Sequence, residues 1–188
     1  MKFIERCKQI LEAFNPNDHV LEPAKTKVTI IIGRYSPFHI GHAAMVKKAK
    51  HPVIMLLVKG TVSSKDKDKN PFPADVQEKI IRNARISKIK DVVQVESADL
   101  VKIFDKLRAE GYEPVELIAG EDRIPFYKQM AQNYVTKLNG DLEVTLSDRV
   151  MSATEVRNHI KNDDFEGTKE RMVNLDKKTY DLIKKYVN

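Results

Sequence analysis

Apolar and polar positions follow two alternating patterns along the chain. Five short runs are rich in apolar or β-branched residues, and most are continuous rather than alternating: residues 28–32, 53–58, 92–95, 115–119 and 142–146. Between them lie four segments whose apolar positions recur every three or four residues: 40–50, 74–86, 98–110 and 125–138. Continuous apolar runs are typical of strands buried on both faces, and the three-to-four spacing is typical of helices. Strands that alternate with helices predict an α/β fold with an open five-stranded parallel sheet and helices on both faces.

Both ends of the chain carry further helical patterns. Residues 3–14 form one apolar stripe that ends at a turn over 15–18, so we expect an N-terminal helical extension within residues 1–22. This helix either covers part of the sheet or forms a contact in a homo-oligomer. The core is expected over 27–147 and C-terminal helices over 148–188, all within a single domain spanning 1–188. Ser152 or Thr154 caps the first C-terminal helix, with Glu155 completing a capping box.

Composition describes an ordinary globular chain and narrows its surroundings. The 188 residues are 41% hydrophobic and 32% charged, and no apolar run approaches the roughly 20 residues that cross a bilayer. Charged residues interrupt the first 14 positions, so no secretory signal is expected and a cytoplasmic location is predicted. Cys7 is the single cysteine, which excludes an internal disulfide and a cysteine-rich zinc site.

The excess of basic residues does not by itself identify a partner. The net charge is +6 and the sequence pI is about 9.2, which suits nucleic acid and polyphosphate ligands equally. The few aromatic residues are not interleaved with basic ones, the arrangement that stacks single-stranded bases. We therefore expect a small polyphosphate ligand and consider nucleic acid a minor alternative, and no membrane partner is indicated.

The junction after the first apolar run carries the strongest chemical signal. Residues 33–42 read Gly-Arg-Tyr-Ser-Pro-Phe-His-Ile-Gly-His and join a predicted strand to a predicted helix. Open parallel sheets bind ligands at the carboxyl ends of their strands, and the free N–H groups of a helix start attract phosphate. His39 and His42 are three residues apart, so both rings can face one ligand, and Gly41 between them permits close approach. The junction predicts a nucleotide triphosphate site.

This stretch resembles the His-x-Gly-His signature of the nucleotidyltransferase superfamily. Three further stretches resemble family motifs in family order: Asn-Pro-Phe-Pro at 70–73, Ala-Gly-Glu-Asp-Arg at 119–123 and Met-Ser-Ala-Thr-Glu-Val-Arg at 151–157. The resemblance runs from about residue 28 to 174. Within the superfamily, the chain is similar to archaeal-type or phage-encoded adenylyltransferases. This similarity implies a Rossmann-like fold, a nucleotidyltransferase activity, and a location in the host cytoplasm if the source is viral.

The resemblance implies roles for particular residues. His42 is expected at the α-phosphate of ATP, His39 at the triphosphate, and Arg157 at the pyrophosphate oxygens. The other expected nucleotide-binding residues are Gly33, Arg34, Ser36, Phe38, Gly41, Lys47, Gly120, Asp122, Arg123, Ser152 and Thr154. Lys47 is expected to point back along its helix towards the site. Mg²⁺ is expected to be carried by ATP, and no dedicated metal site is predicted.

The second substrate is the open part of this hypothesis. We expect first that the chain transfers AMP from ATP to nicotinamide mononucleotide, which gives NAD and pyrophosphate. The chain has no tryptophan, on which many family members stack nicotinamide, and residues 74–77 read Ala-Asp-Val-Gln where archaeal-type members carry Glu-Arg. Cytidylyl transfer, or adenylyl transfer to phosphopantetheine, a flavin mononucleotide or a sugar phosphate, stays open. A protein of this fold that binds nucleotide or RNA without catalysis is the remaining alternative.

Overall fold

The fold is built on one parallel sheet. The computed structural model describes residues 25–59, 66–96, 99–120, 124–138, 142–147 and 151–187. Within them the sheet has five strands in the order β3-β2-β1-β4-β5, and every neighbouring pair is parallel. The strands are β1 (Thr26–Gly33), β2 (Val53–Val58), β3 (Ile89–Val95), β4 (Tyr112–Gly120) and β5 (Glu143–Ser147). The predicted five-stranded parallel sheet is therefore confirmed.

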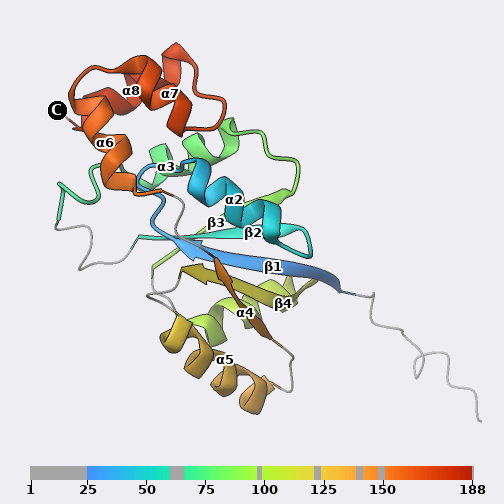
Figure 1. Cartoon of the computed structure of the whole chain (residues 1–188). Helices are drawn as coiled ribbons and strands as arrows, with labels where there is room; N and C mark the ends of the chain where they lie inside the picture. Colours follow the sequence, from blue (N-terminus) through green and yellow to red (C-terminus); the bar gives the residue numbers. More distant parts are fainter. Residues whose placement is uncertain are drawn as a thin grey trace, which may run out of the picture.

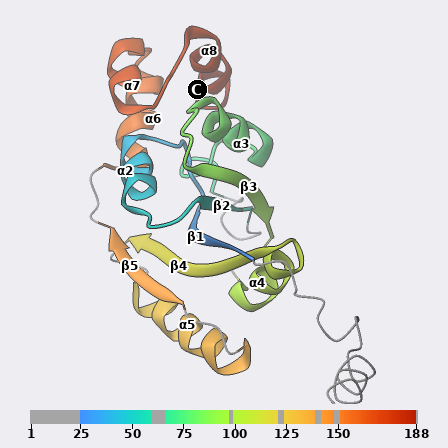
Figure 2. The same ribbon diagram turned by 90° about the vertical axis from the view of Figure 1, so that its right-hand side faces the viewer.

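Helices cover both faces of this sheet, as predicted (Figure 1). The described helices are α2 (Ile40–Lys48), α3 (Ala74–Asn83), α4 (Leu100–Ala109), α5 (Ile124–Leu138), α6 (Ala153–Lys161), α7 (Phe165–Arg171) and α8 (Lys177–Val187). Figures 1 and 2 show α4 and α5 on one face and the other five helices on the opposite face. The expected N-terminal helix lies outside the described residues.

Alternate side chains of the strands serve two separate cores. In β1, Ile31 points into the core shared with α2, α3, α6 and α8, whereas Ile30 and Ile32 point into the core beneath α4 and α5. Each of these side chains is at least nine-tenths buried. This double burial is the physical reason for the continuous apolar runs in the sequence.

The predicted boundaries shift where turn geometry or pairing intervenes. α3 ends at Asn83 rather than at residue 86, because Arg85 has a φ of 51° in the left-handed region and cannot continue a right-handed helix. β3 begins at Ile89 rather than at residue 92, because its first residues pair with β2 despite their polar side chains. Tertiary pairing extends this strand beyond its apolar stretch.

The C-terminal helices share the core of the sheet. Val156 and Ile160 of α6 and Tyr180 and Ile183 of α8 are completely buried in the same cluster as Ile31. This packing places the start of α6 above the carboxyl ends of the strands (Figure 1). The family-like stretch 151–157, called the second motif from here on, therefore begins over the sheet and belongs to the same domain, whereas residues 33–42 carry the first motif.

The capping prediction for α6 is half right. The Ser152 hydroxyl caps the helix by accepting a hydrogen bond from the Thr154 N–H at 3.2 Å. The predicted return bond from Glu155 does not form, because the Glu155 carboxylate accepts from Nε of Arg171 at 2.9 Å instead. An ion pair with α7 thus replaces the local capping box.

Candidate active site

The loop between β1 and α2 is folded around Tyr35. This residue has a φ of 47° and its hydroxyl donates to the Ile31 carbonyl at 2.6 Å, so the ring turns back against the strand. A Cβ on Gly33 would lie 3.0 Å from Cε1 of Tyr35. A side chain at position 33 would therefore push the tyrosine ring by a few tenths of an ångström.

The two histidines form a reciprocal capping box at the start of α2. Nδ1 of His39 accepts from the Gly41 N–H at 3.1 Å, and Nδ1 of His42 accepts from the His39 N–H at 3.2 Å. A neutral imidazole that accepts at Nδ1 carries its proton on Nε2. Both rings therefore present an Nε2–H donor, the group that binds a phosphate oxygen.

Packing around His42 keeps its imidazole neutral. Its ring centroid lies 3.9 Å from that of His39, 5.5 Å from Phe38 in a stacked arrangement and 5.1 Å from Tyr35 edge-on. Burial, and secondly the neighbouring His39, lower the pKa of His42 well below its usual value. At neutral pH this residue is an uncharged hydrogen-bond donor. Phe38 was expected to bind nucleotide. Its side chain is 1% exposed, so it positions His42 by packing instead of facing a ligand.

Gly41 allows the second motif to approach the first. A Cβ at Gly41 would lie 2.9 Å from Cε1 of His39 and 3.5 Å from Cβ of Met151. The first contact means that a side chain at position 41 would displace the His39 ring. The second shows that the residue before the α6 cap packs directly over the start of α2.

Arg157 makes a second link between the two motifs. Its Nη1 donates to the Ser36 carbonyl at 2.6 Å, and its Nη2 donates to Oγ1 of Thr154 at 2.9 Å. The side chain is buried, and burial lowers the pKa of Arg157 from its usual value, although an arginine stays protonated in proteins. The structure therefore places a cation in contact with the backbone of the loop that precedes His39 and His42.

Hydroxyl groups of both motifs lie around this cation. Ser36 Oγ is buried and has no hydrogen-bond partner among the residues that the structure describes. Ser152 and Thr154 each accept one hydrogen bond within α6, which leaves their hydroxyl protons to donate. Buried polar groups are almost always hydrogen-bonded, so the Ser36 hydroxyl points to a bound ligand or water.

Other expected site residues lie at the same edge of the sheet or away from it. Gly120 ends β4 beside Ser147 of β5. Lys47 is exposed in the last turn of α2, about 10 Å along the axis from the first turn at 1.5 Å per residue. The described part of the chain shows no hydrogen bond or ion pair between Lys47 and the histidines, and the role of Lys47 at the site stays a prediction. Asp122 and Arg123 lie outside the described residues.

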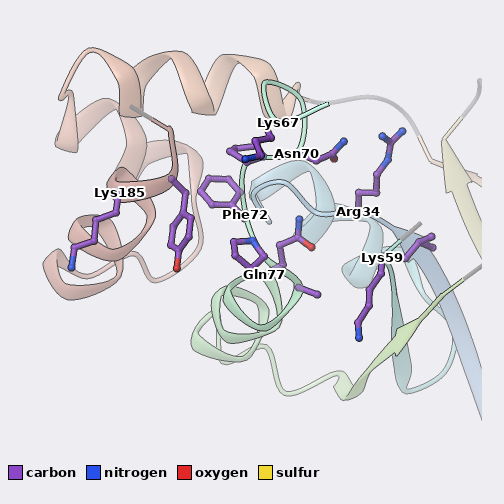
Figure 3. Close-up of a pocket in the computed structure, with 12 residues that line it drawn as sticks. Arg34, Lys59, Lys67, Asn70, Phe72, Gln77 and Lys185 are labelled. Atoms are coloured by element: carbon purple, nitrogen blue, oxygen red, sulfur yellow. The ribbon is translucent and has the colours of Figure 1, made fainter. Parts of the chain in front are cut away.

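An open cavity of about 600 Å³ adjoins the first motif. It is lined by Arg34, Val58, Lys59, Lys67, Asn70, Pro71, Phe72, Pro73, Ala74, Gln77, Lys185 and Tyr186. Figure 3 shows Arg34 and Lys59 on one side of Phe72 and Lys185 on the other. Arg34 therefore faces this cavity, which extends from the ends of β1 and β2 to α8. No sequence pattern indicated the contribution of α8, which follows Phe72 by more than 100 positions.

Two further properties concern only the described parts of the chain. There, no group of three or more His, Cys, Asp or Glu side chains is arranged to hold a metal ion. None of the helices in those segments is both long and apolar enough to span a bilayer.

A parallel sheet with two helix starts and two motifs at its carboxyl edge defines a class of nucleotide-binding α/β enzymes. The family model described as cytidylyltransferase-like matches residues 30–159. The chain belongs to this family, within the His-x-Gly-His nucleotidyltransferase superfamily, and is a nucleotidyltransferase. Comparison with curated proteins gave no match.

Solved structures share the fold at low sequence identity. A nicotinic acid mononucleotide adenylyltransferase from Plasmodium falciparum, complexed with NaAD, is 15% identical, with a TM-score of 0.56 over 86% of this chain and 96% of that one. A putative nicotinate-nucleotide adenylyltransferase from Vibrio parahaemolyticus is 11% identical, with a TM-score of 0.57 over 84% and 98%. The TmcAL protein of Thermotoga maritima, bound with alpha-thio ATP, is 13% identical, with a TM-score of 0.51 over 87% and 56%. These likenesses establish a common fold.

Proposed function

We propose that this nucleotidyltransferase moves AMP from ATP to a small phosphorylated acceptor and releases pyrophosphate. One observation supports this most strongly: Arg157 of the second motif donates to the Ser36 carbonyl in the loop that carries His39 and His42. We infer that the two imidazole donors, the two helix starts and the buried guanidinium act on one ligand. Such a set of donors matches the oxygens of a triphosphate.

In the proposed reaction, an oxygen of the acceptor phosphate attacks the α-phosphorus of ATP. The new P–O bond forms as the bond from the α-phosphorus to the α,β-bridging oxygen breaks. The electron pair of the broken bond leaves with pyrophosphate. His42 donates from Nε2 to an α-phosphate oxygen, and His39 donates to the triphosphate. Ser152, Thr154 and Arg157 hold the leaving group. Positioning and charge stabilisation supply the rate, because a phosphate oxygen is already a nucleophile at neutral pH.

We place magnesium on the triphosphate of ATP. Mg²⁺ takes oxygen ligands, keeps several waters and commonly borrows phosphate oxygens, so hydroxyl and imidazole donors around the triphosphate fit an ion carried by the nucleotide. When bound, the ion neutralises charge on the leaving pyrophosphate. The side chains of this chain then orient the nucleotide rather than enclose the metal.

Nicotinamide mononucleotide is the acceptor that we place first, which makes NAD the product. The fold is shared with proteins named as nicotinic acid and nicotinate mononucleotide adenylyltransferases, and the cavity beside Arg34 has room for a mononucleotide. Tyr186 packs edge-on against Phe72 with ring centroids 6.3 Å apart, and its exposed ring is the aromatic surface that we place in the role of the missing tryptophan. Phosphopantetheine, flavin mononucleotide and sugar phosphates are the competing acceptors.

The test is pyrophosphate release by the purified chain with magnesium and ATP. Each acceptor is supplied separately, and CTP replaces ATP in a parallel series. We expect release with ATP and a pyridine mononucleotide, and a loss of two to three orders of magnitude in kcat for His42→Ala, as for removal of one oxyanion donor. Release with CTP alone would reassign the nucleotide. No release with any pair would overturn the proposed activity.

A further inference from the structure

Gln77 is a nearly buried residue whose amide faces the cavity of about 600 Å³ beside Arg34, which we call the acceptor cavity. It lies in the first turns of α3, its backbone N–H donates to the Pro73 carbonyl at 3.0 Å, and it is 5% exposed. Its neighbour Val76 and the residue one turn later, Ile81, are fixed in the core, so the rotation of the helix is set. Figure 3 shows the Gln77 amide between Phe72 and Arg34, directed into the cavity.

This amide has no hydrogen-bond partner among the described residues, and its polar atoms are accessible from the open cavity rather than sealed in the interior. Polar groups deeper in the described segments are paired, as Glu116 is with Thr29 and Thr145, apart from the Ser36 hydroxyl. A buried amide without a protein partner is satisfied by water or by a ligand. A ligand group that reproduces those hydrogen bonds binds better than one that does not.

We infer that Gln77 is a specificity-determining residue that recognises an uncharged donor–acceptor group of the acceptor, and so favours a carboxamide over a carboxylate. This inference rests on the proposed function. A primary amide offers two N–H donors and one carbonyl acceptor, so it pairs in two directions with the carboxamide of nicotinamide mononucleotide. The corresponding acid only accepts, so it can pair with the Gln77 N–H group but leaves the Gln77 carbonyl oxygen without a donor.

Cations in the cavity oppose this preference but do not outweigh it. Arg34, Lys67 and Lys185 are exposed, and Lys59 already pairs with Glu96 at 3.5 Å. An exposed ion pair changes affinity by about fivefold at most. A buried amide left with a mismatched partner costs about tenfold or more. Hydrogen bonding at Gln77 therefore decides between the two ligands.

The experiment measures binding of nicotinamide mononucleotide and nicotinic acid mononucleotide by calorimetry, with the whole chain and its variants. We expect the wild type to bind the amide at least about tenfold more tightly than the acid. Gln77→Met removes the polar group at similar volume and should reduce this preference below about threefold. Gln77→Glu keeps an acceptor for the amide and repels the acid, so it should retain or increase the preference. Gln129→Met, on exposed α5, is the matched control and should change neither affinity.

The outcomes separate this inference from the proposed function. The role of Gln77 is overturned if the wild type binds both ligands equally, or if Gln77→Met keeps the wild-type preference. In either case, pyrophosphate release with one of these ligands would still support the proposed reaction. Equal weakening of both ligands in both Gln77 variants indicates a structural role and also overturns it. Failure to bind either ligand overturns the inference together with the pyridine acceptor, and release with another acceptor would then still support nucleotidyl transfer.

Discussion

Replacement of Arg157 by lysine tests the link between the two motifs. Two guanidinium nitrogens hold the Ser36 carbonyl and the Thr154 hydroxyl in a buried position. A lysine keeps the charge but has one nitrogen, so it cannot reproduce a planar fork. Loss of one hydrogen bond to a buried charged group costs about 1.5–3 kcal/mol. We expect Arg157→Lys to lower the free energy of unfolding by about 2 kcal/mol.

Urea denaturation measures this loss, and calorimetry with ATP measures its effect on the site. We expect ATP binding to weaken by about tenfold, because the His39 loop loses its anchor and the pyrophosphate loses a bidentate partner. Arg82→Lys is the control, since Arg82 is about half exposed and pairs with Glu78 and Asp91, so it should cost less than about 1 kcal/mol. Wild-type stability and ATP affinity in Arg157→Lys would refute the reasoning.

Three further changes probe the site and the sheet. Gly41→Ala places a Cβ 2.9 Å from Cε1 of His39 and should reduce kcat/KM by about tenfold or more through displacement of the ring; wild-type kinetics would exclude a role for the His39 position. The pKa of folded His42 is lowered, so between that value and about 6.5 the unfolded chain binds more protons. Stability should therefore fall as pH drops below about 6.5, approaching 1.4 kcal/mol per pH unit, and urea titrations at pH 7.5 and 5.5 should show a smaller fall for His42→Asn. Glu116 accepts from Thr29 at 2.6 Å in the interior, so Glu116→Leu should lower the thermal unfolding temperature by leaving several donors unpaired, at about 1–3 kcal/mol or more; an unchanged temperature would show that water replaces the carboxylate.

The sheet was predictable from the sequence because burial on both faces leaves a direct mark. Ile30, Ile31 and Ile32 point alternately into two cores, so apolar residues follow one another without polar alternation. The edge strand β3 was less predictable, because the polar Asp91 pairs with Ile54 of β2 and Lys90 lies where the register shifts. Boundaries followed tertiary pairing and left-handed turns rather than hydrophobic spacing.

The candidate site was predictable in its motifs but not in its contacts. Spacing placed His39 and His42 on one helix start, yet no pattern predicts that each imidazole caps the other residue's backbone. Arg157 was expected to meet phosphate, whereas the structure also shows it holding the Ser36 carbonyl. Such long-range contacts depend on the packing of α6 and leave no periodic signal.

Gln77 and Tyr186, which line the cavity beside Arg34, were missed for a similar reason. Gln77 sits on a helix whose apolar spacing indicates only core positions, and its burial beside an open cavity is a property of the assembled fold. Tyr186 reaches Phe72 from the last helix of the chain. The identity of the second substrate depends on such residues, which explains why the motifs left it open.

A crystal structure with magnesium and α,β-methylene-ATP, an analogue that resists transfer, tests whether one nucleotide tail joins the two motifs. We expect an α-phosphate oxygen within hydrogen-bond distance of His42 Nε2 and the β- and γ-phosphates against Ser152, Thr154 and Arg157. A triphosphate that contacts the histidines but leaves α6 untouched, or that lies elsewhere on the chain, would refute the proposed arrangement.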